Sequence, residues 1–336
     1  MKKKGYLFVL MAAMCWATLG LFGNTLMSLG LIPEQVAFLR LFVGFLILTI
    51  YALIKNPTIL KINKKGFIFA LLVGFVCQAG FNMFYFNYVK TIGVSLSTVL
   101  VYTSPLFIAL FSRIIYKEKI DNVKKVSLAL CFIGAFIAVT NGRLDFKALN
   151  GFGLLLGVGS SITYSFMPII SKTALKYCDS VTLIIYGFLF GAILILPIAK
   201  PVDMINCLAN PKALIFALSL GVVTAALAYI FYLKGIDTGI DLSLVGVLAS
   251  VELVISSVLG WTILSEDFSF IKLFGVCLMM VSAYIATNHQ VMNLYKMSMK
   301  LLAKIHFDLA TCWRTISFRQ RYILVLTSDI SVAQKL

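Results

Sequence analysis

The sequence predicts an all-α integral membrane protein with ten transmembrane helices, arranged as two five-helix inverted repeats (5+5). Three observations support this prediction. Hydrophobic residues make up 61% of the 336 residues and charged residues only 12%, with a mean hydropathy of +0.99. Long apolar runs recur along most of the chain. A pattern in the first half of the sequence also returns in the second half at a constant distance.

The composition excludes a soluble globular protein, because such domains are about half apolar and about a quarter charged. This chain has too few polar residues to cover a surface in water, so we place it in a lipid bilayer. A membrane β-barrel would show alternating strands of about ten residues, and these apolar runs do not alternate.

Ten runs are long enough to be membrane helices, since about 20 apolar residues in a helix cross the ~30 Å hydrocarbon core. In chain order they span residues 5–27, 34–54, 66–89, 94–115, 122–140, 151–171, 180–198, 212–233, 240–263 and 270–288. The first run follows three lysines, as a signal peptide does, but it is too long and lacks a small-residue cleavage pattern. We therefore interpret it as a retained transmembrane helix.

The net charge of +16 is unevenly distributed over the connections between these helices. With the N-terminus inside, the inner connections hold Lys2, Lys3, Lys4, Lys55, Lys61, Lys64, Lys65, Arg113, Lys117, Lys119, Lys124 and Lys125. The outer connections hold Lys90, Arg143, Lys147, Lys200, Lys212 and Lys272. This bias follows the positive-inside rule and predicts a bacterial cytoplasmic membrane protein with both termini cytoplasmic. The basic charge therefore contacts anionic lipid and does not indicate a nucleic-acid partner.

The chain contains an internal duplication with an offset of 148 residues. The segment YTSPLFIALFSRIIYKEK (102–119) matches SVELVISSVLGWTILSED (250–267). A glutamate follows Pro105 by thirteen residues in the first segment and follows Leu253 by thirteen residues in the second. Matched positions include Trp16 with Tyr164, Pro105 with Leu253, Glu118 with Glu266, and AFIA at 135–138 with AYIA at 283–286. One offset that serves both ends and the middle predicts two repeats, 1–142 and 149–290. A basic cytoplasmic tail, 291–336, follows them.

Each repeat has five predicted helices, an odd number, so the second repeat must enter the membrane in the opposite orientation. The connection after the fourth helix is strongly basic, whereas its counterpart after the ninth holds only Lys272. Inverted repeats are typical of secondary transporters, in which two related bundles enclose a site near the bilayer midplane. The duplication therefore indicates a transporter that works by alternating access.

Several segments resemble the drug/metabolite transporter superfamily, in particular its ten-helix EamA-type members. They are Trp16, the LRLFVG around Arg40, the two matched segments 102–119 and 250–267, and Tyr164 with Lys172. The resemblance covers residues 5–288. It implies two inverted five-helix repeats, a central substrate cavity, and export or exchange of small metabolites.

The chain departs from the family pattern in two places that bear on the substrate class. The family commonly has Glu-Pro in the second copy, whereas here Glu252 is followed by Leu253. A lysine is often found near the end of the first helix, where this chain has Asn24. Because only the first copy keeps its proline, Pro105, we expect a helix kink there and an unequal bend in the two halves.

Two charged residues inside predicted helices are candidates for the site. Glu252 lies near the middle of the ninth helix, where an unpaired charge costs roughly 3 kcal/mol by insertion scales. It is a candidate proton carrier or contact for a substrate amine, and a structural hydrogen bond to a neighbouring helix is the alternative. Arg40 suits a carboxylate or phosphate, but snorkelling or pairing with a loop acid such as Glu34 would also explain it.

Polar and aromatic residues within the predicted helices form the rest of the candidate site. Such groups need partners in hydrocarbon, so they line a polar cavity or bridge helices. Helical spacing brings Gln78, Asn82 and Tyr85 onto one face. The predicted substrate-binding residues are Trp16, Arg40, Gln78, Asn82, Tyr85, Tyr102, Tyr164, Tyr229 and Glu252.

The sequence shows no pattern for a cofactor, a metal or catalysis. It lacks a phosphate-binding G-x-x-x-x-G-K-[ST] motif and an H-E-x-x-H motif, and both histidines, His289 and His306, lie in the tail. The seven cysteines are scattered, without the close spacing of metal ligands. We therefore expect no enzyme, no cofactor and no metal site.

The function predicted from the sequence is secondary active export or exchange of a small polar metabolite, with amino acids and amines as candidates. Protons are the candidate coupling ion, through Glu252. Two other classes stay open. A membrane-embedded enzyme acting on lipid would gather polar residues at one interface, and a structural or signalling membrane protein would need no central cavity.

Overall fold

The computed structural model describes residues 2–84, 99–142, 151–263 and 268–288. Within these ranges all regular secondary structure is helical and no strand occurs, which confirms the predicted fold class. Nine helical stretches there are long and apolar enough to cross a membrane. They are Lys4–Ser28, Pro33–Lys55, Lys64–Phe84, Val99–Tyr116, Asn122–Thr140, Ser180–Ala199, Pro211–Asp237, Leu242–Thr262 and Phe270–Asn288. The predicted tail, 291–336, lies outside the described residues.

Shorter elements make up several of these spans. The first half contains α1 (Lys2–Ala17), α2 (Leu19–Ser28), α3 (Pro33–Lys55), η1 (Pro57–Leu60), α4 (Lys64–Leu72), η2 (Val73–Gly80), α7 (Ser104–Tyr116) and α8 (Asn122–Thr140). The second half contains α9 (Gly151–Ala174), α10 (Ser180–Ala199), η4 (Pro201–Met204), α11 (Ile205–Leu208), α12 (Pro211–Ser219), η5 (Leu220–Leu227), α13 (Ala228–Asp237), α14 (Leu242–Ala249), α15 (Val251–Thr262) and the final helix, Phe270–Asn288.

The tenth predicted run, 151–171, forms α9, which is 24 residues long. Its sequence is rich in glycine and serine, and its serines are buried. The hydroxyls of Ser160 and Ser165 donate to backbone carbonyls three residues earlier on the same helix. These buried hydroxyls are therefore satisfied within the helix itself.

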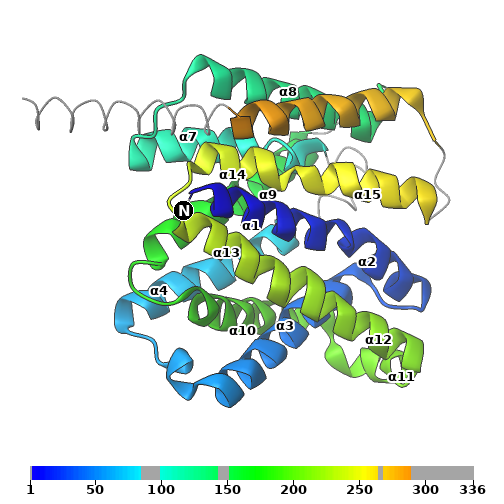
Figure 1. Ribbon diagram of the computed structural model, residues 1–336. Helices are drawn as coiled ribbons and strands as arrows, with labels where there is room; N and C mark the ends of the chain where they lie inside the picture. The colour runs from blue at the N-terminus through cyan, green and yellow to red at the C-terminus, as the bar shows by residue number, and fades with distance from the viewer. Residues whose placement is uncertain (1, 85–98, 143–150, 264–267, 289–336) are drawn as a thin grey trace, which may run out of the picture. The chain divides into compact units, whose positions relative to one another are not determined.

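Helices from the two halves pack against each other in matching pairs. In Figure 1, α1 runs beside α13, and α8 runs beside the final helix. A Cβ added at Gly134 on α8 would lie 2.7 Å from the carbonyl oxygen of Gly275, so these two backbones are in close contact. Likewise α3 packs on η5 and α10 packs on η2. The second helix of each repeat therefore packs against the third helix of the other repeat.

The third helix of each half contains a π-helical segment. In the first half α4 continues into η2, and in the second half α12 continues into η5. The two segments lie at nearly equivalent positions of the repeat, although their sequences, VGFVCQAG and LGVVTAAL, share few residues. Short π-helical segments often occur at functional sites. Each of these segments faces the second helix of the opposite half.

The fourth helix of each half is interrupted at the same repeat position. In the first half the interruption lies at Tyr102 and Thr103, just before Pro105, as the proline predicts. In the second half it lies at Ser250, between α14 and α15. The hydroxyl of Thr103 donates to the Leu100 carbonyl, and that of Ser250 donates to the Gly246 carbonyl. Such local bonds can bend a helix without a proline, so the interruption does not require one.

Candidate functional site

A cavity of about 400 Å³ lies between the two halves. Both repeats contribute to its wall, mainly from α1, α2 and α3, the segments around residues 77–82 and 101–104, α9, α13, α14 and α15. Its lining residues include Trp16, Gly20, Asn24, Met27, Pro33, Arg40, Cys77, Phe81, Asn82, Tyr102, Ser104, Tyr164, Met167, Tyr229, Tyr232, Ser250, Glu252 and Ser256. Trp16 is buried, whereas Gly20, Asn24 and Met27 are exposed. The cavity therefore runs from the middle of the first span toward the end of α2.

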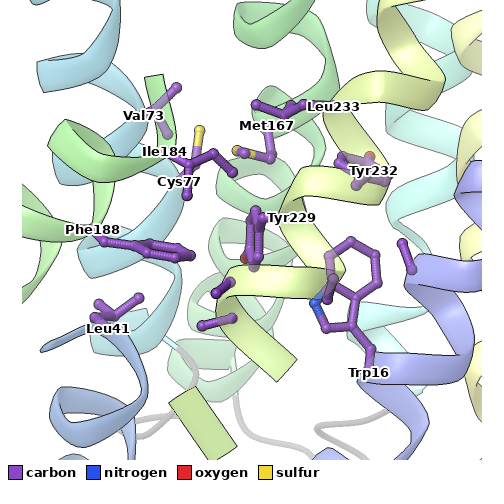
Figure 2. Close-up of a cluster of buried hydrophobic side chains, with 14 of the residues drawn as sticks. Trp16, Leu41, Val73, Cys77, Met167, Ile184, Phe188, Tyr229, Tyr232 and Leu233 are labelled. Carbon is purple, nitrogen blue, oxygen red and sulfur yellow. The ribbon is translucent and has the colours of Figure 1, made fainter. Parts of the chain in front are cut away.

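Aromatic side chains form one wall of this cavity. The Trp16 ring centroid lies 5.3 Å from that of Tyr229 and 5.1 Å from that of Tyr232. Figure 2 shows Trp16 of α1 facing these two tyrosines of α13, with Phe188 on the far side of Tyr229. Edge-to-face packing of this kind holds each ring in a fixed orientation. The wall joins α1 of the first half to α13 of the second half.

Arg40 supplies a positive charge to the cavity from α3. It is only 9% exposed, and its Nε has no hydrogen-bond partner among the described residues. An unpaired buried guanidinium N–H is costly, because burial removes its water. A bound anionic group would satisfy this donor.

Glu252 supplies a carboxyl group from the first turn of α15. Its side chain is partly exposed within the cavity wall. Arg40 interacts with it electrostatically, yet the direct ion pairs found among the described residues are those of Lys124, with Glu118 and with Asp241. The cavity thus contains a guanidinium group and a carboxyl group that form no ion pair with each other in the described part of the chain.

Gln78 lies behind the cavity wall rather than in it. It is 1% exposed and is absent from the lining. Its Oε1 accepts a hydrogen bond from the Tyr229 hydroxyl at 3.3 Å, and its backbone carbonyl accepts one from Asn82 Nδ2. Gln78 therefore holds one lining tyrosine from the π-helical segment η2.

Seven of the nine predicted binding residues line the same cavity. They are Trp16, Arg40, Asn82, Tyr102, Tyr164, Tyr229 and Glu252. Gln78 contacts this group from behind, and Tyr85 lies outside the described residues. Pro105 is buried, and its Cα would lie 3.0 Å from a Cβ added at Gly246, so it packs against α14.

Two residues that line the cavity were not among the predicted binding residues, although each is the repeat equivalent of a residue that was. Phe81 is equivalent to Tyr229 at the 148-residue offset, and its ring lies 5.4 Å from that of Tyr164. Ser250 is equivalent to Tyr102, and both line the cavity. Applying the offset to each candidate would have found both residues from the sequence.

A family model described as "EamA-like transporter family" matches residues 3–140 and 151–288. An "Uncharacterized transporter YwfM" of Bacillus subtilis is 25% identical over 280 residues, which cover 82% of this chain and 90% of that protein. An "Uncharacterized inner membrane transporter YicL" of Salmonella typhimurium is 22% identical over 83% of this chain and 94% of its own length. A solved crystal structure superimposes with a TM-score of 0.70 at 18% identity, over 85% of this chain and 97% of its own.

Proposed function

The chain belongs to the EamA-like transporter family, and we propose that it is a secondary active exporter or exchanger of a small polar metabolite. The substrate we propose carries both a negative and a positive group, as amino acids do. It binds in the cavity between the halves, and the two bundles then expose it alternately to each side of the membrane.

The observation that supports this proposal is the pair of opposite charges in one cavity. Arg40 has a buried donor without a partner, and it forms no salt bridge with Glu252 in the described part of the chain. A carboxylate of the substrate would bind Arg40 through charge-assisted hydrogen bonds. A substrate amine would lie toward Glu252. Two charges held apart by the fold favour a ligand that bridges them over one with a single charge.

The aromatic wall formed by Trp16, Tyr229 and Tyr232 supports the same type of substrate. Aromatic rings and an ammonium group attract each other when the cation lies over the ring face. The hydroxyl groups of the tyrosines also supply neutral hydrogen-bond partners. The cavity volume of about 400 Å³ falls within the range of small-molecule sites.

We propose that Glu252 also couples transport to protons. In this scheme a proton and the substrate amine compete for the same carboxylate. The proton then returns in one direction when the substrate leaves in the other. This part of the proposal rests on the place of Glu252 in the cavity wall, inside the span Leu242–Thr262.

The basic residues suggest the orientation. Lys4, Lys64 and Lys119 occur at the ends of spans on the side predicted to be inside. Under the positive-inside rule this end faces the cytoplasm, and the cavity mouth near Met27 faces outward. A membrane-embedded enzyme remains the alternative, and it would act without any gradient across the membrane.

The test is thermal stability of the purified protein with pooled amino acids, amines, nucleosides and sugar phosphates. A ligand at ~100 times its dissociation constant stabilises the folded state by about 2.7 kcal/mol. We expect the amino-acid pool to raise the melting temperature of the wild type, and this rise to shrink in Arg40→Gln and Glu252→Gln.

The matched control is Asp203→Asn, which removes an exposed acid in η4, away from the cavity. It should keep the full stabilisation by the amino-acid pool. Stabilisation by amines alone that depends only on Glu252 would favour an amine substrate. Stabilisation that none of the cavity variants changes would place the binding site elsewhere.

A further inference from the structure

A second group of charged side chains lies at the opposite end of α1 from the cavity mouth. Its members are Glu118, which follows α7, Lys124 in the first turn of α8, and Asp241, which precedes α14. A Cβ added at Gly5, near the start of α1, would lie 2.9 Å from Ile240 Cγ2, so this end of α1 packs beside Asp241. The mouth of the cavity lies at the end of α2, beyond Trp16. We call this group the charged latch.

Glu118 joins the first half of the chain to the second. Its Oε2 accepts a hydrogen bond from the backbone N–H of Leu242 at 2.9 Å, and its Oε1 accepts one from that of Ser243 at 3.4 Å. The Ser243 hydroxyl also donates to Oε1. The carboxylate therefore satisfies the first N–H groups of α14, where the helix dipole favours a negative charge.

Lys124 holds this arrangement together. Its Nζ donates to Glu118 Oε1 at 3.2 Å and to Asp241 Oδ2 at 2.7 Å, and it also donates to the Lys119 carbonyl at 2.9 Å. The side chains of Lys124 and Glu118 are only 6% and 8% exposed. The charge pattern of the sequence places Lys124 in an inner connection, whereas the structure buries it between two carboxylates. A lysine buried in this way bridges the halves rather than contacting lipid.

The backbones of the two halves are also in close contact at this end. A Cβ added at Gly235 of α13 would lie 2.7 Å from Val9 Cγ2 and 3.0 Å from the Gly5 carbonyl oxygen, both of α1. Leu244 and Val245 of α14 are 1% and 0% exposed. In the described part of the chain, α1, α13 and α14 are therefore closely packed at this end.

We propose that the charged latch is the gate that closes this end of the transporter, and that it opens when the mouth at the other end closes. This inference rests on the proposed transport function. Alternating access requires the packed end to separate in the second state, and the latch bonds between the halves must then break. The latch stabilises the state in which the mouth near Met27 is open.

α14 connects the latch to the cavity. The helix is eight residues long, begins next to Glu118 and ends at Ser250, where the fourth helix of this half is interrupted. Ser250 and Glu252 both line the cavity. Glu252 lies in the first turn of α15, two residues beyond Ser250, so a ligand that shifts it would act on the end of α14, which Glu118 holds at its start. This gives a physical link between substrate binding and release of the gate.

The test is hydrogen–deuterium exchange of the purified full chain in lipid nanodiscs, without any substrate. In Glu118→Gln we expect peptides covering Leu242–Ala249 to exchange about tenfold faster. We also expect peptides covering Leu19–Ser28 to exchange severalfold more slowly, because the mouth closes as the latch opens. The second effect is specific to a gate, since a lost helix cap alone would change only α14.

Two further variants keep the test decisive. Asp241→Asn leaves Glu118 in place and removes only one partner of Lys124, so it should shift both peptides in the same directions by a smaller factor even if Glu118→Gln folds poorly. Asp179→Asn is the matched control, because Asp179 accepts from the Val181 N–H within one half. It should change neither peptide.

The proposal would be overturned if both latch variants exchange faster in α14 but show unchanged exchange over Leu19–Ser28. The latch would then be only a structural cap of α14. Unchanged exchange at both ends would overturn the proposal as well. Because the measurement needs no substrate, its outcome is independent of whether the amino-acid pool stabilises the protein. Failure of the gate and failure of the proposed substrate are therefore distinguishable.

Discussion

The two halves of the molecule share a scaffold but differ in the charged residues that they place on it. The aromatic pairs Trp16 with Tyr164 and Phe81 with Tyr229 occupy equivalent repeat positions, and all four line the cavity. The charges are not repeated. Phe188 stands at the position equivalent to Arg40, and Ser104 at the position equivalent to Glu252.

The charged residues of the latch are also only partly repeated in the sequence of the other half. Glu266 and Lys272 are the repeat equivalents of Glu118 and Lys124, but Gly93 stands where Asp241 would be. Gly93 and Glu266 lie outside the described residues, so this comparison rests on the sequence alone. The duplication supplies two similar scaffolds, and on our proposals the charges that are not repeated select the substrate and favour one arrangement over the other.

The largest effect should come from removing the unrepeated positive charge. Arg40→Phe gives the first half the residue that the second half has at the equivalent position. We expect it to weaken substrate binding by about 2–5 kcal/mol, because truncating one partner of a buried charge pair leaves the other unsatisfied. Binding of the stabilising pool, measured by calorimetry, checks this. Binding that survives unchanged would remove Arg40 from the site.

A smaller effect should follow from disturbing the close packing between the halves. A Cβ at Gly221 on η5 would lie 2.3 Å from Val43 of α3, and one at Gly74 on η2 would lie 2.6 Å from Phe190 of α10. We expect Gly221→Ala and Gly74→Ala each to lower the unfolding free energy by about 1–3 kcal/mol through overpacking. Thermal unfolding measures this.

The control for these two variants is Gly151→Ala at the start of α9, where no neighbouring atom of the described residues lies within 4 Å of an added Cβ. It should leave stability nearly unchanged. A strong effect in only one of the π-helical segments would show that the two halves are not equivalent in packing.

Glu252→Gln tests whether the carboxyl group that the second half has in place of Ser104 couples transport to protons. The amide cannot carry a proton, so we expect accumulation driven by a pH gradient to be lost in proteoliposomes. Exchange of substrate across the membrane without a gradient should continue, because Arg40 still holds the carboxylate. If gradient-driven accumulation survives in this variant, Glu252 is not the coupling residue.

The smallest effect should come from making the second latch more like the first. Gly93→Asp supplies the carboxylate that the sequence lacks at the position equivalent to Asp241. We expect it to favour closure of the mouth by about 1 kcal/mol, within the usual range of allosteric coupling. Slower deuterium exchange over Leu19–Ser28 measures this, and Gly93→Asn is the neutral control. Equal exchange in both variants would show that the added carboxylate does not pair with Lys272.

The sequence by itself determined the all-helical membrane fold and the duplication. These follow from composition and from a constant offset, since an apolar run of about 20 residues has few alternatives in a bilayer. It also indicated most of the cavity wall, because polar and aromatic side chains within spans must face one another. Trp16, Arg40, Tyr229 and Glu252 are examples.

Only the tertiary structure decided which polar residues point into the cavity and which support it. Gln78 and Tyr229 look alike as polar residues in apolar helices, yet one lies behind the wall and the other in it. The sequence also placed Lys124 among the orienting charges, whereas the fold brings it to Glu118 and to Asp241, 117 positions along the chain. Such pairings depend on which helices meet across the halves, and hydropathy and periodicity carry no information about that.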